Sequence, residues 1–446
     1  MKNLIRHYLL LLISITTSYL FNIAAYAGDY IDDIIVSPKT VEEIEDPLEY
    51  GLKPEEKPEV KYKKGLEELP EFLRDSSITT HFRSYGFSRD NESDSDPDAF
   101  AIGGELRFFS GLLKNTFRIG ASYYLSHGIH EDEGEKTQLL NSRGGGINKL
   151  GELYLAATVD EYSARLYRQS FSLPYLNKQD SRMVPNTHEA YIIQYDGEQF
   201  DSIAGHVTQI KKRNAQRFTS MAEAAGATNS SKGTFMAGAR YNLNSDINIG
   251  AINYFTDDVF NIFYSEFNYS NKLTKEISMK ITGQFTHQKS VGDTLIGEFD
   301  TNHYGLQLKA SYQHAILTLA ATNTGSGAEI ISPFGGRPGF LSLMLSDFDR
   351  ANEQGVLAGL SYDFSKWGLP GLSSFAKFAW GKNAKEASSG QNLPDLNEYN
   401  LTIDYKPARS WLNGLWLRLR HARSDFEGGS YTKDTRVILN YEFPLY

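Results

Sequence analysis

The chain has 446 residues and a formal net charge of −10, with 45 lysines and arginines against 55 aspartates and glutamates. This balance excludes the basic footprint of a nucleic-acid-binding protein, and the absence of cysteine excludes disulfide frameworks, thiol catalysis and cysteine-ligated metals. The composition combines 27 Tyr, 26 Phe and 38 Gly with only 40% hydrophobic residues. That combination is typical of a membrane barrel, in which only every second residue of a strand meets lipid.

Residues 1–27 have the pattern of a cleavable secretory signal peptide. Lys2 and Arg6 precede an apolar run from residue 8 to residue 23, and Ala25, Tyr26 and Ala27 form a small-x-small cleavage site. Loss of these two basic residues takes the net charge of the exported chain from −10 to −12. An uncleaved anchor is the alternative, but the run is short for a membrane span of roughly 20 residues.

Residues 28–75 differ in composition from the rest of the chain. They are charged and punctuated by proline, as in the stretches 41–47 and 54–58. Such a segment cannot bury much apolar surface, so we predict a flexible periplasmic extension with a short helix between residues 65 and 73. A partner-binding tail or a plug is the alternative.

From residue 77 onward, apolar side chains alternate with polar or small ones. In residues 415–420, leucine occupies every odd position, whereas Trp416, Arg418 and Arg420 occupy the even ones. A period of two predicts strands whose two faces see different solvents. A soluble sandwich would alternate in the same way, but the export signal and the aromatic residues near strand ends favour a lipid-facing wall.

We therefore predict an all-β fold, a transmembrane antiparallel β-barrel of about 18 strands that occupies residues 76–446. The expected strands are 77–88, 98–110, 112–126, 149–159, 161–170, 187–195, 200–211, 233–243, 246–254, 258–270, 276–288, 302–313, 315–323, 355–365, 371–382, 396–406, 414–424 and 432–443.

The connections between these strands alternate in length. Those after even-numbered strands are short, and most of the others are long, notably 127–148, 212–232 and 324–354. Short periplasmic turns and long extracellular loops are typical of outer-membrane barrels; the short connection near Asp257 is an exception. The aromatic last strand, with Tyr441 and Phe443, predicts recognition by the barrel assembly machinery.

The lumen-facing positions of these strands collect basic residues although the chain is acidic. They are Arg83, Arg107, Arg118, Arg165, Lys280, Lys309, Lys377, Arg418, Arg420 and Arg436. A row of cations in a narrow pore attracts anions, especially carboxylates, which arginine binds through two parallel hydrogen bonds. Barrel interiors are polar in any case, so the alternative is that these cations only pair with carboxylates such as Glu105, Asp404 and Glu442.

The connection at residues 173–185 contains two prolines, which stiffen it. A stiff loop with Lys178 and Arg182 either folds inward and narrows the pore or packs on its neighbours as an outer loop. The expected constriction residues are Tyr175, Lys178, Asp180, Ser181 and Arg182.

Residues 173–185 resemble the constriction-loop region of the OprD family of outer-membrane porins. Residues 334–340 (FGGRPGF), followed by 346–353, and the opening strand at 82–90 also resemble that family. The likeness runs from about Leu73 to the C-terminus, and the residues before it look like an addition to the family pattern. The resemblance implies an 18-stranded barrel, a monomer or loose homotrimer, an inward third loop and an arginine ladder.

The resemblance also implies uptake of small carboxylates, amino acids, small peptides or, in some members, oligosaccharides. We expect a passive, substrate-selective channel for small anionic or zwitterionic solutes, embedded in outer-membrane lipid, without a cofactor or nucleic acid. One alternative is a general or oligosaccharide-type porin, in which sugars slide along aromatic lumen residues such as Trp416 and Tyr124. Another is a barrel whose outer loops also act as an adhesin.

An enzyme and a metal protein are both disfavoured by the sequence. The ten histidines form no HExxH and Gly-x-Ser-x-Gly is absent, so no arrangement of nucleophile and base is indicated. The acidic run at residues 90–96 lacks the spacing of an EF-hand and is better explained as a solvated outer loop.

Overall fold

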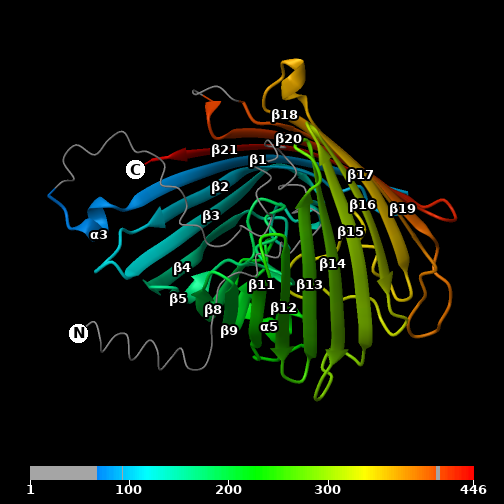
Figure 1. The fold of residues 1–446 in the computed structure, drawn as a ribbon, viewed down its shortest axis with the longest axis horizontal. Helices are drawn as coiled ribbons and strands as arrows, with labels where there is room; N and C mark the ends of the chain where they lie inside the picture. Colours follow the sequence, from blue (N-terminus) through cyan, green and yellow to red (C-terminus); the bar gives the residue numbers. More distant parts are fainter. Residues whose placement is uncertain (1–67, 93, 408–411, 446) are drawn as a thin grey trace.

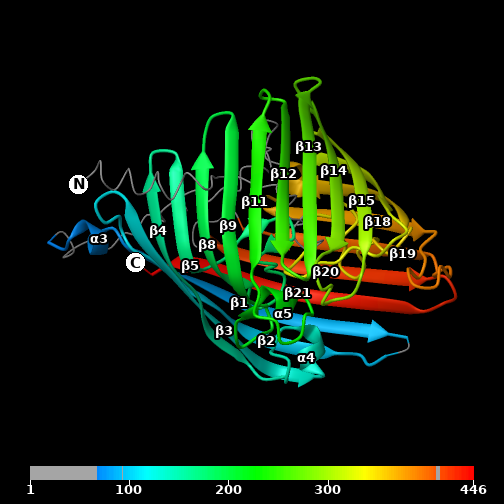
Figure 2. The ribbon, with the colours of Figure 1, turned by 90° about the horizontal axis from the view of Figure 1, so that it is seen from below.

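The computed structural model describes residues 68–92, 94–407 and 412–445. Its main feature is one antiparallel sheet that closes on itself, because the first strand, β1 (Ser77–Asn91), pairs with the last, β21 (Tyr431–Pro444). The result is an 18-stranded barrel with strongly tilted strands (Figures 1 and 2). The predicted fold class is therefore confirmed.

Between β1 and β21 the wall continues through sixteen further strands in chain order. They are β2 (Asp98–Phe109), β3 (Phe117–Asp132), β4 (Ile147–Val159), β5 (Tyr162–Gln169), β8 (Thr187–Asp196), β9 (Phe200–Lys211), β11 (Thr234–Asn242), β12 (Ile247–Thr256), β13 (Phe260–Lys272), β14 (Ile277–Ser290), β15 (Asp300–Tyr312), β16 (Ala315–Thr324), β17 (Gln354–Asp363), β18 (Leu372–Lys382), β19 (Leu396–Tyr405) and β20 (Leu415–Phe426).

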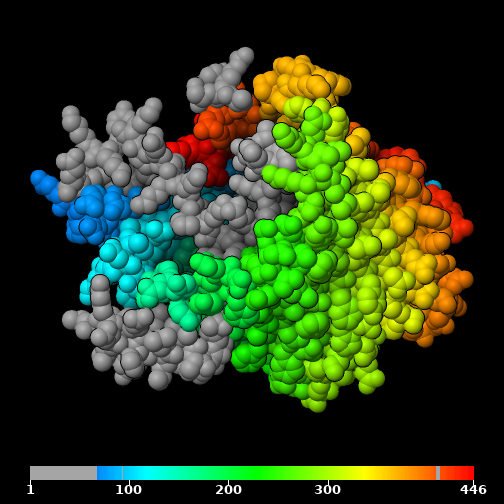
Figure 3. All heavy atoms as spheres, viewed as in Figure 1, coloured from blue at the N-terminus to red at the C-terminus, as the bar shows by residue number. Residues whose placement is uncertain are grey.

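The alternation in the sequence becomes the two sides of this wall. On β20, Leu417 and Leu419 are 38% and 44% exposed on the outside, whereas Arg418 and Arg420 are only 5% and 2% exposed inside the barrel. The outer wall made by β12 to β17 forms a continuous surface in Figure 3. A one-residue slip in register would exchange the two faces, so the pattern fixes which residues meet lipid.

Both predicted bounds of the third strand are wrong by several residues. The strand spans Phe117–Asp132 rather than residues 112–126. Lys114 and Asn115 both have φ of 53°, in the left-handed region, and form the turn that precedes the strand. Left-handed backbone cannot continue a strand ladder, and asparagine tolerates it better than most residues.

The connections differ between the two rims. At one rim, short turns join the strands, apart from the 3₁₀ turn η2 (Phe364–Trp367), and helix α3 (Glu71–Arg74) lies near the end of β21 (Figure 1). At the other rim lie the longer loops with α4 (Gly134–Thr137), α5 (Met221–Ala224), the hairpin β6 (Ser172–Leu173) and β7 (Leu176–Asn177), and the two-residue β10 (Thr219–Ser220). The β12–β13 connection is short there, as predicted from the sequence.

The predicted signal peptide and the N-terminal extension up to residue 67 lie outside the described residues, so both remain predictions. The described part of the predicted helix at 65–73 is only the short α3. Within the described ranges, no helix has the length and apolar character needed to cross a membrane.

Candidate functional site

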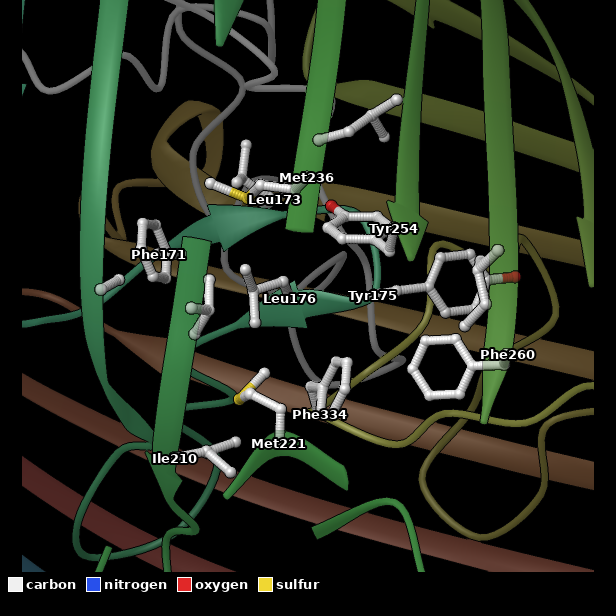
Figure 4. Close-up of a cluster of buried hydrophobic side chains, with 14 of the residues drawn as sticks. Phe171, Leu173, Tyr175, Leu176, Ile210, Met221, Met236, Tyr254, Phe260 and Phe334 are labelled. Carbon is white, nitrogen blue, oxygen red and sulfur yellow. The ribbon is translucent and has the colours of Figure 1, made fainter. Parts of the chain in front are cut away.

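The inner wall of the barrel divides into an apolar part and a charged part. The inward faces of β8 to β13 carry apolar side chains such as Ile192, Met236 and Tyr254, which form one cluster with residues of three outer loops (Figure 4). The ten predicted ladder residues all project inward from the remaining strands, β14 to β21 and β1 to β5. Charged side chains also face inward on the apolar side, where Arg240 pairs with Asp201 at 3.2 Å and Glu266 is buried on β13, but the predicted ladder lies on the other side.

Four of these residues form an arginine wall on three adjacent strands: Arg83 on β1, Arg436 on β21, and Arg418 and Arg420 on β20. Arg420 lies directly opposite Arg436 in the strand register. All four side chains are at most 7% exposed. Two arginines directly opposite each other concentrate positive charge at one level of the pore.

Carboxylate and hydroxyl side chains on β19 and β21 hold this wall in place. Arg418 forms an ion pair of 2.8 Å with Asp404, and Arg436 forms one of 3.0 Å with Asp434. The Arg420 Nε donates to the Thr402 hydroxyl at 3.3 Å. The pairing that the sequence offered as an alternative role is thus real for two members, and it also orients their planar guanidinium groups.

Three further ladder residues form a lysine wall on the far side of β19: Lys280 on β14, Lys309 on β15 and Lys377 on β18. Lys280 and Lys309 are directly opposite each other. The strands β14, β16 and β18 contain no acidic residue, and buried neighbours on these inner faces include Thr282, Gln307 and Thr318. The nearest buried carboxylates on the inner faces of the adjoining strands are Glu266 on β13 and Glu398 on β19.

The last three ladder residues are rim arginines near the short turns: Arg107 on β2, Arg118 on β3 and Arg165 on β5. Arg107 pairs with Glu105 at 2.8 Å. The Arg165 guanidinium lies 4.5 Å from the ring centroid of Tyr154. The Nε atoms of Arg118 and Arg165 are buried without a hydrogen-bond partner in the described part of the chain.

The predicted constriction segment belongs to loop 3 (residues 170–186), which lies inside the barrel. Its hairpin β6–β7 packs on the apolar part of the wall, where Leu173, Tyr175 and Leu176 are at most 5% exposed (Figure 4). The Tyr175 hydroxyl donates to Thr286 of β14 at 3.0 Å. Burial raises the pKa of Tyr175 to about 12, so this donor keeps its proton.

The second half of loop 3 crosses to the arginine wall. Asp180 forms an ion pair of 2.7 Å with Arg83, and Arg83 also donates to the carbonyl of Arg182. The Tyr85 hydroxyl donates to the carbonyl of Ser181 at 3.3 Å. Burial favours the neutral form of Asp180, but the charge and hydrogen bonds of Arg83 outweigh it and hold the pKa of this carboxyl below its ordinary value.

A second inward loop, loop 7 (residues 325–353), was not predicted from the sequence as part of the pore. Phe334 forms a parallel bridge with Leu176 of loop 3, and Asn177 exchanges hydrogen bonds of 2.6 and 3.2 Å with Gly336. The buried Arg337 pairs with Asp349 at 3.0 Å inside the loop. The FGGRPGF passage is therefore the meeting point of the two inner loops.

Loop 7 also reaches the charged wall. The Met344 carbonyl accepts from Arg436 at 3.3 Å, and the Met344 amide donates to Asn400 at 3.2 Å. The Leu345 amide donates to Glu398 at 3.0 Å. Loops 3 and 7 thus contact the arginine wall from two sides, at Arg83 and at Arg436. Of the predicted constriction residues, the structure joins Asp180, Ser181 and Arg182 to this wall, while Tyr175 lies in the apolar cluster. Lys178 is bonded through its backbone to Phe171 and Asn186.

Comparisons with known proteins agree with this architecture. The model of the OprD family of outer membrane porins matches residues 70–445. Porin D of Pseudomonas aeruginosa is 22% identical over an alignment of 420 residues, which covers 84% of this chain and 92% of that protein.

Solved barrels are similar in fold. Pseudomonas aeruginosa OpdK, crystallised with vanillate, superposes with a TM-score of 0.76 at 21% identity, over 84% of this chain and 100% of that chain. A BenF-like porin from Pseudomonas fluorescens Pf-5 superposes with a TM-score of 0.75 at 18% identity and the same coverage of both chains. The chain belongs to the OprD family of outer membrane porins, a family of substrate-specific channels rather than enzymes, and is located in the outer membrane of a Gram-negative bacterium.

Proposed function

We propose that this porin takes up small carboxylates, amino acids or small peptides by passive diffusion along its arginine wall. The observation that carries the proposal is the position of Arg83, Arg418, Arg420 and Arg436 on three adjacent strands, with loops 3 and 7 attached at Arg83 and Arg436. A solute that passes between the loops and this wall meets fixed guanidinium groups. Such groups bind carboxylates through two parallel hydrogen bonds.

The ion pairs within the wall support selectivity rather than cancel it. Asp404 and Asp434 each accept from the Nε and one terminal nitrogen of their arginine. These two hydrogen bonds hold the plane of each guanidinium in a fixed orientation toward the lumen. Loop 3, with Tyr175, Lys178, Asp180, Ser181 and Arg182, narrows the passage in this proposal, and all ten ladder residues act as successive weak sites.

The likeness to OpdK agrees with this substrate class, because vanillate is a small carboxylate. We further propose that the protein is a monomer or a loose homotrimer, and that the barrel assembly machinery recognises its last strand. Residues 28–75 are proposed to lie in the periplasm.

The test is the reversal potential of single channels in planar bilayers under a salt gradient. We expect the protein to favour anions, and an Arg418→Ala plus Arg420→Ala variant to lose most of that preference, because two of four wall charges are gone. The matched control is Arg423→Ala on the same strand, whose side chain is exposed beside Asp425. It should leave the reversal potential unchanged.

Block of the current by benzoate, a small carboxylate, should weaken in the double variant and persist in the control. Cation preference in the unmodified channel would contradict the arginine wall as a filter while leaving a porin. Equal passage of benzoate and of neutral sugars would favour the general or oligosaccharide-type porin instead.

A further inference from the structure

Loop 4 (residues 212–233), which connects β9 to β11, is a further outer loop that contacts the constriction. Its helix α5 contributes Met221 to the apolar cluster on which loop 3 also packs (Figure 4). Ahead of α5, the loop carries two arginines, Arg213 and Arg217. The side chain of Arg217 is 81% exposed and pairs within its own loop at 3.8 Å, whereas Arg213 is half-buried. The two arginines therefore differ in surroundings although they share a loop.

Arg213 is bonded to two other outer loops at once. Its Nε donates to the Oε1 of Gln138 in loop 2 (residues 133–146) at 2.8 Å, and its Nη1 donates to the hydroxyl of Ser181 in loop 3. Its backbone amide donates to the Oδ1 of Asn186, also in loop 3, at 2.7 Å. Loops 2, 3 and 4 are thus joined at a single residue.

Asn186 extends this junction to loop 7. The residue is 2% exposed, and its Nδ2 donates to the carbonyl of Phe334 in loop 7 at 3.3 Å and to that of Asn177 at 3.4 Å. At the end of β9, the buried Lys211 donates to the carbonyl of Pro185 at 3.2 Å. The C-terminal half of loop 3 is therefore held by β9 and by loops 4 and 7, in addition to its contacts with the arginine wall.

Ser181 connects Arg213 to the arginine wall. Its hydroxyl accepts from Arg213, and its carbonyl accepts from the hydroxyl of Tyr85 on β1 at 3.3 Å. The residues immediately before and after it both bind Arg83 of the wall. A side chain that holds Ser181 in place therefore also determines how loop 3 lies against the wall.

We propose that Arg213 is a positioning residue of the constriction. By holding Ser181, it keeps residues 180–182 against Arg83 and sets the gap through which a carboxylate reaches the arginine wall. The inference rests on the proposed function, because it concerns access to the same wall. Arg213 positions loop 3 rather than binding the solute. A guanidinium suits this task, since its planar fork donates in fixed directions and remains charged.

The first experiment compares Arg213→Ala with Arg217→Ala in planar bilayers. Both variants remove one positive charge from loop 4, but Arg213→Ala also removes the side-chain bonds to Gln138 and Ser181. In Arg213→Ala, the open-channel current should become noisier. The concentration of benzoate that half-blocks the current should rise by about three-fold or more, because a loosened loop 3 must be ordered again when the solute binds. In Arg217→Ala, both quantities should match those of the unmodified channel.

Equal behaviour of these two variants, whether both change or neither does, overturns the inference. A change shared by both would mean that the charge of loop 4 matters and the bonds of Arg213 do not. The midpoint of thermal unfolding in detergent should be the same for both variants, because the strands of the barrel are untouched. That measurement separates a displaced loop from a loss of folded protein.

Ser181→Ala tests the route by which Arg213 acts. If Arg213 works through this hydroxyl, Ser181→Ala alone should reproduce the noisier current and the weaker block by benzoate. The double variant should then be no worse than either single variant, as expected for two residues that act as one unit. Effects of Arg213→Ala and Ser181→Ala that simply add would contradict the route through Ser181 and overturn the inference.

The inference and the proposed function fail in different ways. Anion preference and unchanged block by benzoate in Arg213→Ala, with a quiet current, would overturn the role of Arg213 and leave the proposed function intact. Cation preference without any block by benzoate in the unmodified channel would overturn the proposed function, and with it the access that Arg213 is proposed to set.

Discussion

The arginine wall and the lysine wall lie in the same barrel but are built differently. Arg418 and Arg436 are 5% and 1% exposed and are paired with Asp404 and Asp434 at 2.8 and 3.0 Å. Lys280 and Lys309 are only half-buried, on strands whose inner faces offer threonine, glutamine and serine. In the arginine wall the cations pair with carboxylates of β19 and β21, whereas the strands that carry the lysines offer mainly neutral polar side chains on their inner faces.

This difference assigns the two walls different tasks. Guanidinium groups fixed by their neighbours have a defined geometry, which favours recognition of a planar carboxylate. Lysine ammonium groups are point charges on flexible stems, which raise the local anion concentration without fixing an orientation. We therefore expect substitutions in the arginine wall to affect stability and affinity, and those in the lysine wall to affect mainly the ion flux.

The largest effect is a loss of stability, and it is expected for Asp404→Ala. The change leaves Arg418 buried without its carboxylate and removes the acceptor of the Trp416 indole N–H, 2.5 Å away. Breaking a buried ion pair from one side costs roughly 3–5 kcal/mol. The midpoint of thermal unfolding in detergent, followed by the change in gel mobility of the heated barrel, should fall clearly.

The matched control for this prediction is Asp425→Ala at the far end of β20. Its partner Arg423 is 45% exposed, and pairs of this kind contribute about 0–1 kcal/mol. Similar unfolding midpoints for the two variants would show that the arginine wall is not held by its ion pairs.

A tenfold effect on benzoate binding is expected when arginines of the wall are replaced by lysine, because the hydrogen-bond geometry changes while the charge is kept. In an Arg418→Lys, Arg420→Lys and Arg436→Lys variant, the bidentate contacts to a carboxylate are lost. A hydrogen bond to a charged group contributes roughly 1.5–3 kcal/mol, so the concentration of benzoate that half-blocks the current should rise by about ten-fold or more. The reversal potential should hardly move, because the charge is unchanged.

Converting the other wall with Lys280→Arg plus Lys309→Arg should leave the half-blocking concentration within about two-fold of the original. If both conversions shift it equally, the two walls bind carboxylates alike and the proposed division of tasks is wrong.

The sequence predicted the wall of this barrel far better than its contents. Alternation on β20 identifies Arg418 and Arg420 as inward because a strand has a period of two and needs only local information. The contact of Asp180 with Arg83 joins residues 97 positions apart, and that of Asn177 with Gly336 joins residues 159 apart. No local pattern encodes such pairs. The compositions of residues 173–185 and 334–340 indicate that these two loops are ordered. They do not indicate which residues each loop contacts, because those contacts form only when the barrel closes.

A smaller effect is expected for Lys280→Ala plus Lys309→Ala. Removal of two opposed like charges relieves repulsion, so stability should stay the same or rise by less than about 1 kcal/mol. Anion preference should decline, and less so than in the arginine double variant, because the fixed guanidinium groups remain. A loss of unfolding midpoint comparable to that of Asp404→Ala would contradict a role of the lysine wall that is confined to ion flux.

The smallest effect is expected from pH, and it concerns the attachment of loop 3 to the arginine wall. The pKa of Asp180 is held below its ordinary value by Arg83. A carboxylate of depressed pKa stabilises the folded state above its unfolded pKa of about 3.9, and this contribution is lost as the pH falls through the folded value. Conductance should therefore not change between pH 8 and about pH 5.

The Asp180→Asn variant lacks the ion pair at every pH. Its current at neutral pH should therefore be as noisy as the current of the unmodified channel in strong acid. A transition of the unmodified channel near pH 6 that Asp180→Asn removes would mean that Arg83 does not dominate this carboxyl, and that loop 3 is a pH-controlled element rather than a fixed one.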